Sequence, residues 1–373
     1  MTPGPVQVPE NVRLARSIST TNADLDPKFY DEYKETCELI SKLLHTKNET
    51  LILSGEGILG LEAACASMTE PGDRVLILDN GIYGAGFADF VSMYGGTPVM
   101  YTKDYKNAFD VEELDAYLKE DHDFKYATVV HCDTPSGMLN DIHKICPLLK
   151  SYGIMTVTDS VSGMFGNEVN VDKAQIDILC GGSQKAVSAP PGLTFVTISD
   201  EAKAAMENRK TPIASFYCNL TIFKDYYKNQ WFPYTMPISD IYGLKAAMDN
   251  IAADKDLIGR HAKIANATRY AIKEFGLSLH LESGFSDTVT VFDVPEGMTA
   301  DDILARMREE HGIMLAGSFG ELEGKVIRIG HMGASANVGD MLEVMAGLEE
   351  TLRHFGWKSE QSLLSSFYKE LNR

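Results

Sequence analysis

Lys185 is the residue in this sequence whose surroundings most favour chemistry. It follows soon after the apolar run 176–180, and small residues flank it. A lysine at the end of a buried strand loses hydration, which lowers the pKa of its amine and lets it form a Schiff base. Asp159 ends a second apolar run, 154–158, and precedes Lys185 by 26 residues, a spacing that fits two neighbouring strand ends. Since a pyridoxal cofactor needs a carboxylate for its ring nitrogen and a lysine for its aldehyde, the pair predicts a pyridoxal site.

The Gly-rich turn at residues 54–58 is a candidate for the anionic end of such a ligand. A helical run, 59–68, follows the turn directly. The free N–H groups at the start of a helix form an anion-binding site. Glycines are also common where a strand turns into a helix, so a turn without a binding role is the alternative.

Two loop residues could complete the site. Tyr83 stands between glycines after the run 74–78 and could stack on a flat ring, although a tyrosine that only closes the core is the alternative. Thr134 could hydrogen-bond a ligand hydroxyl, and its alternative is a local turn before Pro135. His131, just before this loop, is interpreted as a structural histidine.

Arg328 is the candidate for binding a substrate anion. It lies inside the apolar segment 326–330, where an arginine needs an anionic partner. A substrate carboxylate would accept two hydrogen bonds from its guanidinium. A buried structural ion pair explains the residue equally well at this stage.

Composition excludes several classes of protein. The chain has 373 residues, of which 44% are hydrophobic and 23% charged, and this favours a folded protein with a large core and two domains. The net charge of −19 without a basic stripe excludes nucleic acid as a partner. Six scattered cysteines without metal-ligand spacing indicate a reducing compartment and no metal site. With no signal peptide and no apolar run of membrane-spanning length, a cytoplasmic protein without a membrane partner is expected.

Short β-rich runs alternate with helical stretches between about residues 50 and 200. The predicted strands are Leu51–Ser54, Arg74–Leu78, Ala127–His131, Ile154–Thr158, Ile176–Cys180 and Leu193–Ile198. This alternation predicts a largely parallel sheet with crossover helices. Ligands of such sheets bind outside the carboxyl ends of the strands, where Asp159 and Gly181 fall.

The rest of the chain predicts a smaller α+β domain. Helices are expected at 27–45, 239–275, 299–311 and 337–355, and further strands at 277–281, 288–293 and 325–330. The prolines of Thr2–Pro5 make this segment an extended arm. The expected division is an N-terminal arm (1–20), a large cofactor-binding domain (21–245), a small C-terminal domain (246–356) and a tail (357–373). The tail carries apolar residues at helical spacing and either docks as a short helix or frays.

Together these motifs resemble the class V aminotransferases of the fold-type I pyridoxal-phosphate superfamily, in the alanine–glyoxylate and serine–pyruvate group. The similarity extends from the Thr2–Pro5 arm to about residue 356, and its most specific element is Ser183–Ala186 with Ala189–Gly192. The resemblance implies an α/β fold with a mostly parallel seven-stranded sheet, crossover helices and a smaller C-terminal α+β domain. It also implies pyridoxal 5'-phosphate (PLP) as cofactor and a homodimer with shared active sites.

The resemblance assigns roles to individual residues. It makes Lys185 the Schiff-base lysine, Asp159 the partner of the ring nitrogen, and Arg328 the residue that binds the substrate carboxylate. The other implied residues are Tyr83 as the stacking aromatic, Thr134 near the ring oxygen, Val161 in the motif of Asp159, Gly4 for the substrate, and, at the phosphate end, Gln184, Glu56, Gly57, Ile58 and Thr235 of the partner subunit.

One branch of the family, the pyridoxamine–pyruvate aminotransferases, is similar in more segments, and there the unphosphorylated vitamer is a substrate. These segments are 55–56, 59–64, 133–137, 232–235 and 328–333. Glu56 bears on the choice, because two unit charges ~4 Å apart near a surface repel by roughly 4 kcal/mol, whereas a helix N-terminus stabilises an anion by about 0.3–1 kcal/mol. Glu56 therefore points away, is protonated, or stands in for the phosphate. Phe319 occupies the place where a second arginine is expected in this branch, which argues for a phosphate-bearing cofactor.

The resemblance implies transfer of an amino group from an L-amino acid to a 2-oxo acid such as glyoxylate or pyruvate. The alternatives within the fold are a 2-aminoethylphosphonate–pyruvate transaminase, a lyase or a cysteine desulfurase. A desulfurase needs a mobile catalytic cysteine, and Cys180 and Cys218 lack an obvious loop context. The alternative outside enzymes is a cofactor-binding regulatory or scaffold protein.

Overall fold

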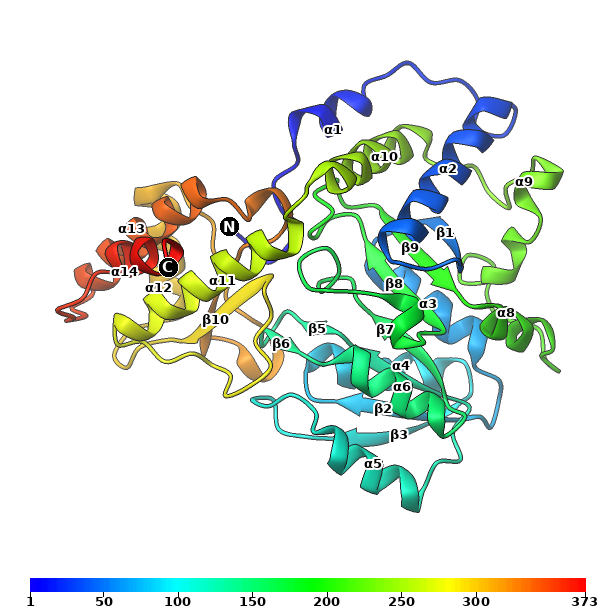
Figure 1. Ribbon diagram of the computed structural model, residues 1–373, viewed down its shortest axis with the longest axis horizontal. Helices are drawn as coiled ribbons and strands as arrows, with labels where there is room; N and C mark the ends of the chain where they lie inside the picture. Colours follow the sequence, from blue (N-terminus) through cyan, green and yellow to red (C-terminus); the bar gives the residue numbers. More distant parts are fainter.

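The computed structural model describes residues 1–373 and has two lobes (Figure 1). The larger lobe is built on a seven-stranded sheet and the smaller lobe on a two-stranded sheet. The strands of the larger sheet are β1 (Glu49–Ser54), β2 (Arg74–Asp79), β3 (Thr97–Thr102), β4 (Tyr126–Val130), β7 (Met155–Asp159), β8 (Ile178–Gly182) and β9 (Leu193–Ile198). A hairpin formed by β5 (Cys132–Asp133) and β6 (Met138–Leu139) follows β4.

The strand order in the larger sheet is β1-β9-β8-β7-β4-β2-β3. Every neighbouring pair from β8 to β3 is parallel, whereas β9 runs antiparallel to both β8 and β1. The predicted fold class is therefore confirmed, with a mostly parallel sheet of seven strands. Because β7 and β8 are parallel neighbours and Asp159 pairs with Cys180, the carboxyl ends of these two strands lie side by side.

Helices connect and cover these strands. The helices of the larger lobe are α1 (Glu10–Ala15), α2 (Pro27–Leu43), α3 (Gly57–Met68), α4 (Ile82–Met93), α5 (Val111–Glu120), α6 (Ile142–Ser151), α7 (Val171–Ala174), α8 (Asp200–Glu207), α9 (Tyr226–Asn229) and α10 (Ile238–Ala253), with a 3₁₀ turn η1 (Leu220–Phe223). Helix α3 packs against β8 and β9, α4 against β2 and β3, and α6 against β7. The first turns of α3 and α4 thus follow strand ends at the same edge of the sheet.

The smaller lobe packs four helices around its strand pair. Its elements are α11 (Leu257–Glu274), β10 (Val289–Asp293), α12 (Ala300–His311), η2 (Gly320–Leu322), β11 (Val326–Gly330), η3 (Gly333–Ser335), α13 (Val338–His354) and α14 (Leu363–Leu371). The tail docks as a helix, because α14 buries Leu363 and Phe367 completely and packs on α11 and α13. Of the two alternatives for the tail, docking is therefore the one observed.

The hydrophobic residues form two main cores. The larger core draws on residues between Val12 and Ile251 and also includes Met332, and the smaller core draws on residues between Ile264 and Leu371. The division at residue 245 stays a prediction. None of the helices combines the length and the apolar composition needed to cross a bilayer.

Two predicted elements differ in the structure. The expected helix 239–275 is two helices, because the chain breaks after α10 and the Asp254 carboxylate binds Arg260 and the Asp256 N–H instead of continuing the helix. Residues 277–281 are not a strand and form only an isolated bridge between Leu279 and Phe292. Strand β3 was not predicted at all.

Candidate active site

Lys185 lies three residues beyond the end of β8, in a turn that closes back onto β9. Its amine donates a hydrogen bond to the Pro3 carbonyl at 2.9 Å, so the N-terminal arm covers it. Burial lowers the pKa of Lys185, and the positive charge of Arg328 acts in the same direction. The sequence-based expectation of a desolvated lysine thus agrees with the geometry.

Asp159 ends the neighbouring strand β7 and is 4% exposed. Its Oδ1 accepts a hydrogen bond from the Val161 N–H at 2.9 Å. Burial raises the pKa of Asp159 to about 7, and the nearby carboxyl of Asp133 adds to the rise, although the charge of Lys185 opposes it. A buried carboxyl without a close cationic partner can pair with a protonated ring nitrogen.

A cavity of about 80 Å³ contains both of these residues. It is lined by Glu56, Gly57, Ile58, Leu61, Tyr83, Asp159, Val161, Ser162, Gln184 and Lys185. Eight of these ten were predicted, and Leu61 and Ser162 were not. Leu61 lies one helical turn after Gly57, so the helical period of the run 59–68 could have indicated it.

Glu56 is the N-cap of α3, and its side chain occupies the helix start. Its Oε1 accepts from the Ile58 N–H at 3.1 Å, and its Oε2 accepts from Gln184 Nε2 at 3.1 Å. Of the alternatives for Glu56, the one in which the carboxylate points away is therefore wrong. The Oε1 atom of Gln184 is buried and has no hydrogen-bond partner within the protein. The helix end that could bind a phosphate already holds a carboxylate, and an unused acceptor lies beside it.

Tyr83 lies in the first turn of α4 and is held by a residue that the sequence did not single out. Asp133 accepts a hydrogen bond from the Tyr83 N–H at 2.9 Å and another from the Ser136 hydroxyl at 2.7 Å. The N-cap position, Gly81, must be a glycine, because a Cβ there would lie 2.4 Å from the Asp133 carboxyl carbon. Asp133 thus caps α4 in place of a local side chain, and burial raises its pKa.

Arg328 extends from β11 toward the loop that follows β5. Its Nη1 donates to the Thr134 carbonyl at 3.3 Å and its Nε to the Gly317 carbonyl. The structure contains no ion pair of Arg328 with a carboxylate, so the alternative of a buried structural ion pair is wrong. Burial lowers the pKa of Arg328. A guanidinium that is largely buried and bonded only to backbone carbonyls can still bind an incoming carboxylate.

The remaining predicted residues lie in three places. Gly4 lies against Lys185, since a Cβ on Gly4 would come within 2.4 Å of the lysine Cδ. Thr134 is buried beside Tyr83 and Arg328. Thr235 lies outside the cavity, where its hydroxyl donates to Asp24 at 3.2 Å, and its expected role in a partner's site stays a prediction.

His131 behaves as a structural histidine. Its Nδ1 bonds to the Ser160 hydroxyl at 2.8 Å, the ring is 3% exposed, and burial lowers its pKa to about 3. A buried histidine that stays neutral at ordinary pH and bonds to a neighbouring hydroxyl fits a structural role. It instead holds the segment after β7 close to β4.

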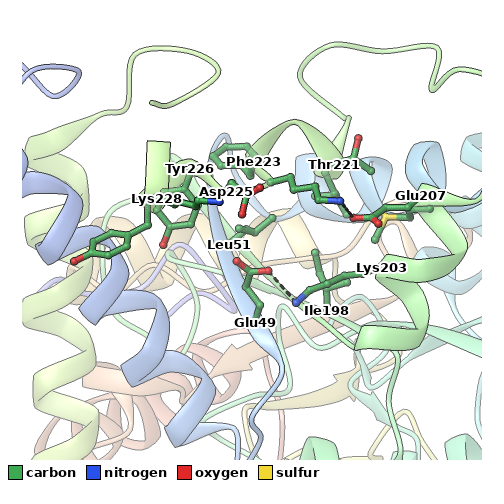
Figure 2. Close-up of a pocket in the computed structure, with 14 residues that line it drawn as sticks. Glu49, Leu51, Ile198, Lys203, Glu207, Thr221, Phe223, Asp225, Tyr226 and Lys228 are labelled. Atoms are coloured by element: carbon green, nitrogen blue, oxygen red, sulfur yellow. Dashed lines mark ion pairs between the residues drawn. The ribbon is translucent and has the colours of Figure 1, made fainter. Parts of the chain in front are cut away.

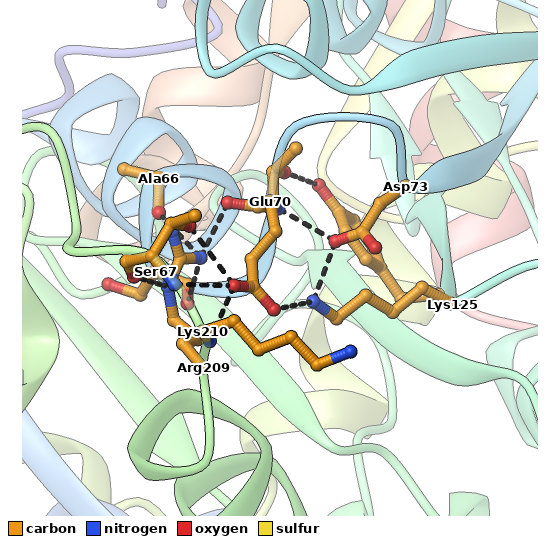
Figure 3. A network of polar contacts seen from close by, with 10 residues as sticks. Ala66, Ser67, Glu70, Asp73, Lys125, Arg209 and Lys210 are labelled. Atoms are coloured by element: carbon orange, nitrogen blue, oxygen red, sulfur yellow. Dashed lines mark hydrogen bonds and ion pairs between the residues drawn. The ribbon is translucent and has the colours of Figure 1, made fainter.

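The far end of α3 is fixed by a polar network (Figure 3). Arg209 donates to the Ser67 carbonyl at 3.0 Å and also to the carbonyls of Ala66 and Thr69, which closes the last turn of the helix. Glu70 accepts from the Lys210 N–H at 2.7 Å, from Thr211 and from Lys125. Both ends of α3 are therefore anchored, which fixes the helix start at the cavity.

A second cavity, of about 370 Å³, opens beside the edge strand β1 and is separate from Lys185 (Figure 2). Its charged side chains are mostly paired with each other, Lys203 with Glu49 at 2.9 Å and Lys224 with Glu207 at 2.8 Å. Nowhere in the chain do three or more His, Cys, Asp or Glu side chains gather as metal ligands would. The chemistry-bearing residues are thus concentrated at the carboxyl ends of β7 and β8.

A mostly parallel seven-stranded sheet, with a desolvated lysine after one strand and a buried aspartate at the end of its neighbour, defines a fold-type I pyridoxal enzyme. The sequence model of the family "Aminotransferase class-V" matches residues 12–322 of the chain. The chain therefore belongs to the class V aminotransferases, a PLP-dependent family, as the sequence motifs predicted.

Individual relatives agree with this assignment. The chain is 34% identical to the pyridoxamine–pyruvate transaminase of Mesorhizobium japonicum, over 90% of this chain and 86% of that protein. The crystal structure of the pyridoxamine–pyruvate aminotransferase of Mesorhizobium loti matches with a TM-score of 0.95 at 30% identity, covering 100% and 96% of the two chains. The ureidoglycine–glyoxylate aminotransferase of Bacillus subtilis matches with the same TM-score and identity, over 100% and 97%.

Proposed function

We propose that the protein transfers an amino group from an L-amino acid to a 2-oxo acid such as glyoxylate or pyruvate. The observation that carries this proposal is Arg328, which is largely buried, has no carboxylate partner and lies close enough to Lys185 and Tyr83 to affect the pKa of both. Amino acids and 2-oxo acids share a carboxylate next to the reacting carbon. One arginine can therefore bind both substrates in turn.

Lys185 moves the proton in this proposal. A bound pyridoxal ring supplies an electron sink for the substrate's reacting carbon. The Nζ of Lys185 acts first as a base and takes the proton from the Cα of the amino acid. It later acts as an acid and gives a proton to the reacting carbon of the 2-oxo acid, which thereby becomes the new amino acid. The lowered pKa of Lys185 favours this exchange, because a smaller share of the amine is locked as ammonium.

Asp159, Tyr83 and Asp133 hold the ring in this proposal. The Asp159 carboxylate keeps the ring nitrogen protonated, and burial makes this contact strong because water does not screen it. Tyr83 stacks on the ring, and its position depends on the hydrogen bond from its N–H to Asp133. These residues fit a pyridoxal ring.

The fit is less good at the phosphate end, and this supports a second candidate function. The Glu56 carboxylate already accepts the Ile58 N–H at the start of α3, and a phosphate there would be repelled by roughly 4 kcal/mol at ~4 Å. The unpaired Oε1 of Gln184 suits a hydroxyl donor. In this second candidate, unphosphorylated pyridoxal or pyridoxamine is a substrate and pyruvate is the acceptor.

Reduction with borohydride followed by intact-mass measurement and peptide mapping distinguishes the two candidates. A phosphopyridoxyl group on Lys185 of the purified protein supports a resident PLP. Labelling of Lys185 only after free pyridoxal is added supports the vitamer as substrate. Absence of label with both PLP and pyridoxal contradicts both, and Lys185→Ala is the control that should stay unlabelled.

The other candidate functions have less support. All six cysteines are buried, and burial raises the pKa of Cys180 and of Cys218, so neither is a reactive thiolate for a desulfurase. A sulfide-release assay with cysteine tests this directly. Screening amino donors, 2-aminoethylphosphonate included, tests the remaining transaminase alternative. A scaffold without activity would convert no amino donor at all.

We also propose a cytoplasmic homodimer with shared sites. Phe216, Tyr217 and Trp231 are each more than half exposed, and they flank the segment that leads to Thr235. Burying them against a second copy would remove a large apolar surface from water. Light scattering of the purified protein measures the mass in solution. The six free cysteines support a reducing compartment.

A further inference from the structure

Phe319 is an exposed aromatic side chain that lies beside the substrate arginine. Its ring centroid is 6.1 Å from that of Tyr83 in an edge-on arrangement, with an interplanar angle of 66°. The guanidinium carbon of Arg328 lies 5.9 Å from the same ring centroid. The ring is 42% exposed, which is high for a phenylalanine in contact with two largely buried residues.

The backbone around Phe319 is fixed by contacts from both lobes. The Gly317 carbonyl accepts a hydrogen bond from Arg328, and the Ser318 hydroxyl donates to the Pro135 carbonyl at 3.1 Å. Phe319 is also the N-cap residue that directly precedes η2. The backbone next to Phe319 is therefore held beside Arg328, and the ring lies against the guanidinium and Tyr83.

The chemistry next to Arg328 follows from this arrangement. Phe319 makes the surface beside the guanidinium apolar, so a substrate side chain that lay along this surface would meet hydrocarbon. The next charged residue in the segment is Glu321, which carries the same sign of charge as a second carboxylate. A dicarboxylic donor would have to desolvate its side-chain carboxylate against a hydrocarbon ring without a cationic partner.

We propose that Phe319 determines the specificity for the amino donor: it admits donors with an uncharged, apolar side chain and rejects dicarboxylic ones. The inference rests on the proposed function, since it takes Arg328 as the site of the α-carboxylate. Phe319 acts through the packing of its ring against the donor side chain. An arginine at the same position would reverse the preference by offering a second cation to the side-chain carboxylate.

The first test measures binding to the protein without cofactor, so that it does not depend on turnover. Calorimetry with butyrate and with succinate compares a monocarboxylate with a dicarboxylate. The wild type should bind butyrate more tightly than succinate, and Phe319→Arg should raise the affinity for succinate relative to butyrate by about tenfold or more, since that is what one charge-assisted hydrogen bond contributes. Phe319→Leu keeps the apolar surface and should keep the wild-type order.

A matched control is Phe355→Arg, because Phe355 is similarly exposed, at 37%, and lies at the end of α13 outside the site. It should leave both affinities unchanged. Tighter binding of succinate than butyrate by the wild type, or an unchanged ratio in Phe319→Arg, would overturn the proposal. Equal, weak binding of both ligands that is unaffected by Arg328→Lys would instead refute the carboxylate role of Arg328, and with it the proposed function.

The second test uses the loaded enzyme and compares kcat/KM for alanine and for aspartate. The wild type should favour alanine, and Phe319→Arg should shift the ratio toward aspartate through KM more than through kcat, because the ring does not take part in proton transfer. A general loss of kcat with an unchanged ratio would contradict a specificity role.

Discussion

Replacing Asp159 with asparagine should stabilise the cofactor-free protein while it destroys activity. Burial raises the pKa of Asp159 to about 7, whereas an aspartate in the unfolded chain has a pKa of about 3.9. Between these values the folded protein holds a proton that the unfolded chain has released, so the stability of the folded state falls as pH rises. Above about pH 8, where Asp159 is ionised in both states, the stability falls no further. Asparagine is uncharged in both states and escapes this penalty, and its amide oxygen can still accept the Val161 N–H.

The size of the effect follows from the two pKa values. Each unit corresponds to about 1.36 kcal/mol, so the variant should be more stable than the wild type by about 3 kcal/mol at pH 6 and about 4 kcal/mol at pH 8. For a chain of this length, 1 kcal/mol corresponds to roughly 1.3 °C in Tm. The expected gain is therefore about 4 °C at pH 6 and about 5 °C at pH 8, with no further gain above pH 8.

The assay is thermal denaturation of both proteins, freed of cofactor, followed by circular dichroism between pH 6 and 9. Asp123→Asn is the matched control, because the side chain of Asp123 is 99% exposed and its removal should change Tm little. A variant that is less stable than the wild type at pH 8 would refute the reasoning, since it would mean that Asp159 gains more from contacts in the folded state than burial costs. In the loaded enzyme the same variant should lose about 10²–10³ in kcat, as is typical when one preorganised charge contact is removed.

Three further substitutions test the site and its support. Lys185→Ala should abolish turnover, measured as amino transfer from any donor that the wild type accepts. Near-normal turnover in this variant would contradict the role of Lys185 as the Schiff-base lysine. Arg328→Lys should raise KM for the amino acid by about 10–100-fold while the bound cofactor's absorbance is retained, because lysine cannot bind a carboxylate bidentately; cofactor loss at an unchanged KM would contradict that role. Glu70→Gln should lower Tm at pH 7, because the ionised carboxylate is stabilised in the folded protein. Desolvation would raise the pKa of Glu70, but hydrogen bonds from Thr211, Lys210 and Lys125 outweigh it and lower the pKa to about 2. This contribution, about 3 kcal/mol at most, is present above the unfolded pKa of about 4.3 and is lost as pH falls toward 2, so the Tm difference should shrink between pH 5 and pH 3; a difference that stays constant with pH would show that packing, not charge, is responsible.

The central part of the fold could be predicted because its strands are buried on both faces. Such strands are continuous apolar runs, and the sequence therefore located β2, β4, β7, β8 and β9 to within two residues at each end. Strand β3 was missed for the opposite reason. It lies at the edge of the sheet, contains Pro98, which suits an edge strand, and exposes three of its six residues, so no continuous apolar run marks it.

The break between α10 and α11 was not predictable from periodicity. The apolar pattern continues through residues 239–275, and the helix ends only because the Asp254 carboxylate binds Arg260 and the Asp256 N–H. These contacts are local, so an Asp-x-Asp sequence inside a helical run could have suggested them.

The sequence did not predict the contacts in which a residue is positioned by another residue far away in the chain. Lys185 and Asp159 were found because each follows its own buried strand, and parallel strands bring their ends together. The hydrogen bond from the Tyr83 N–H to Asp133 joins residues 50 apart and depends on a glycine that leaves room for the carboxylate, and no periodicity encodes that pairing. The sequence singled out Phe319, but its contact with Tyr83 forms only when the smaller lobe packs on the larger one. Sequence patterns thus indicate candidate groups that each follow their own strand, whereas the residues that position them come from distant segments that only the folded structure brings together.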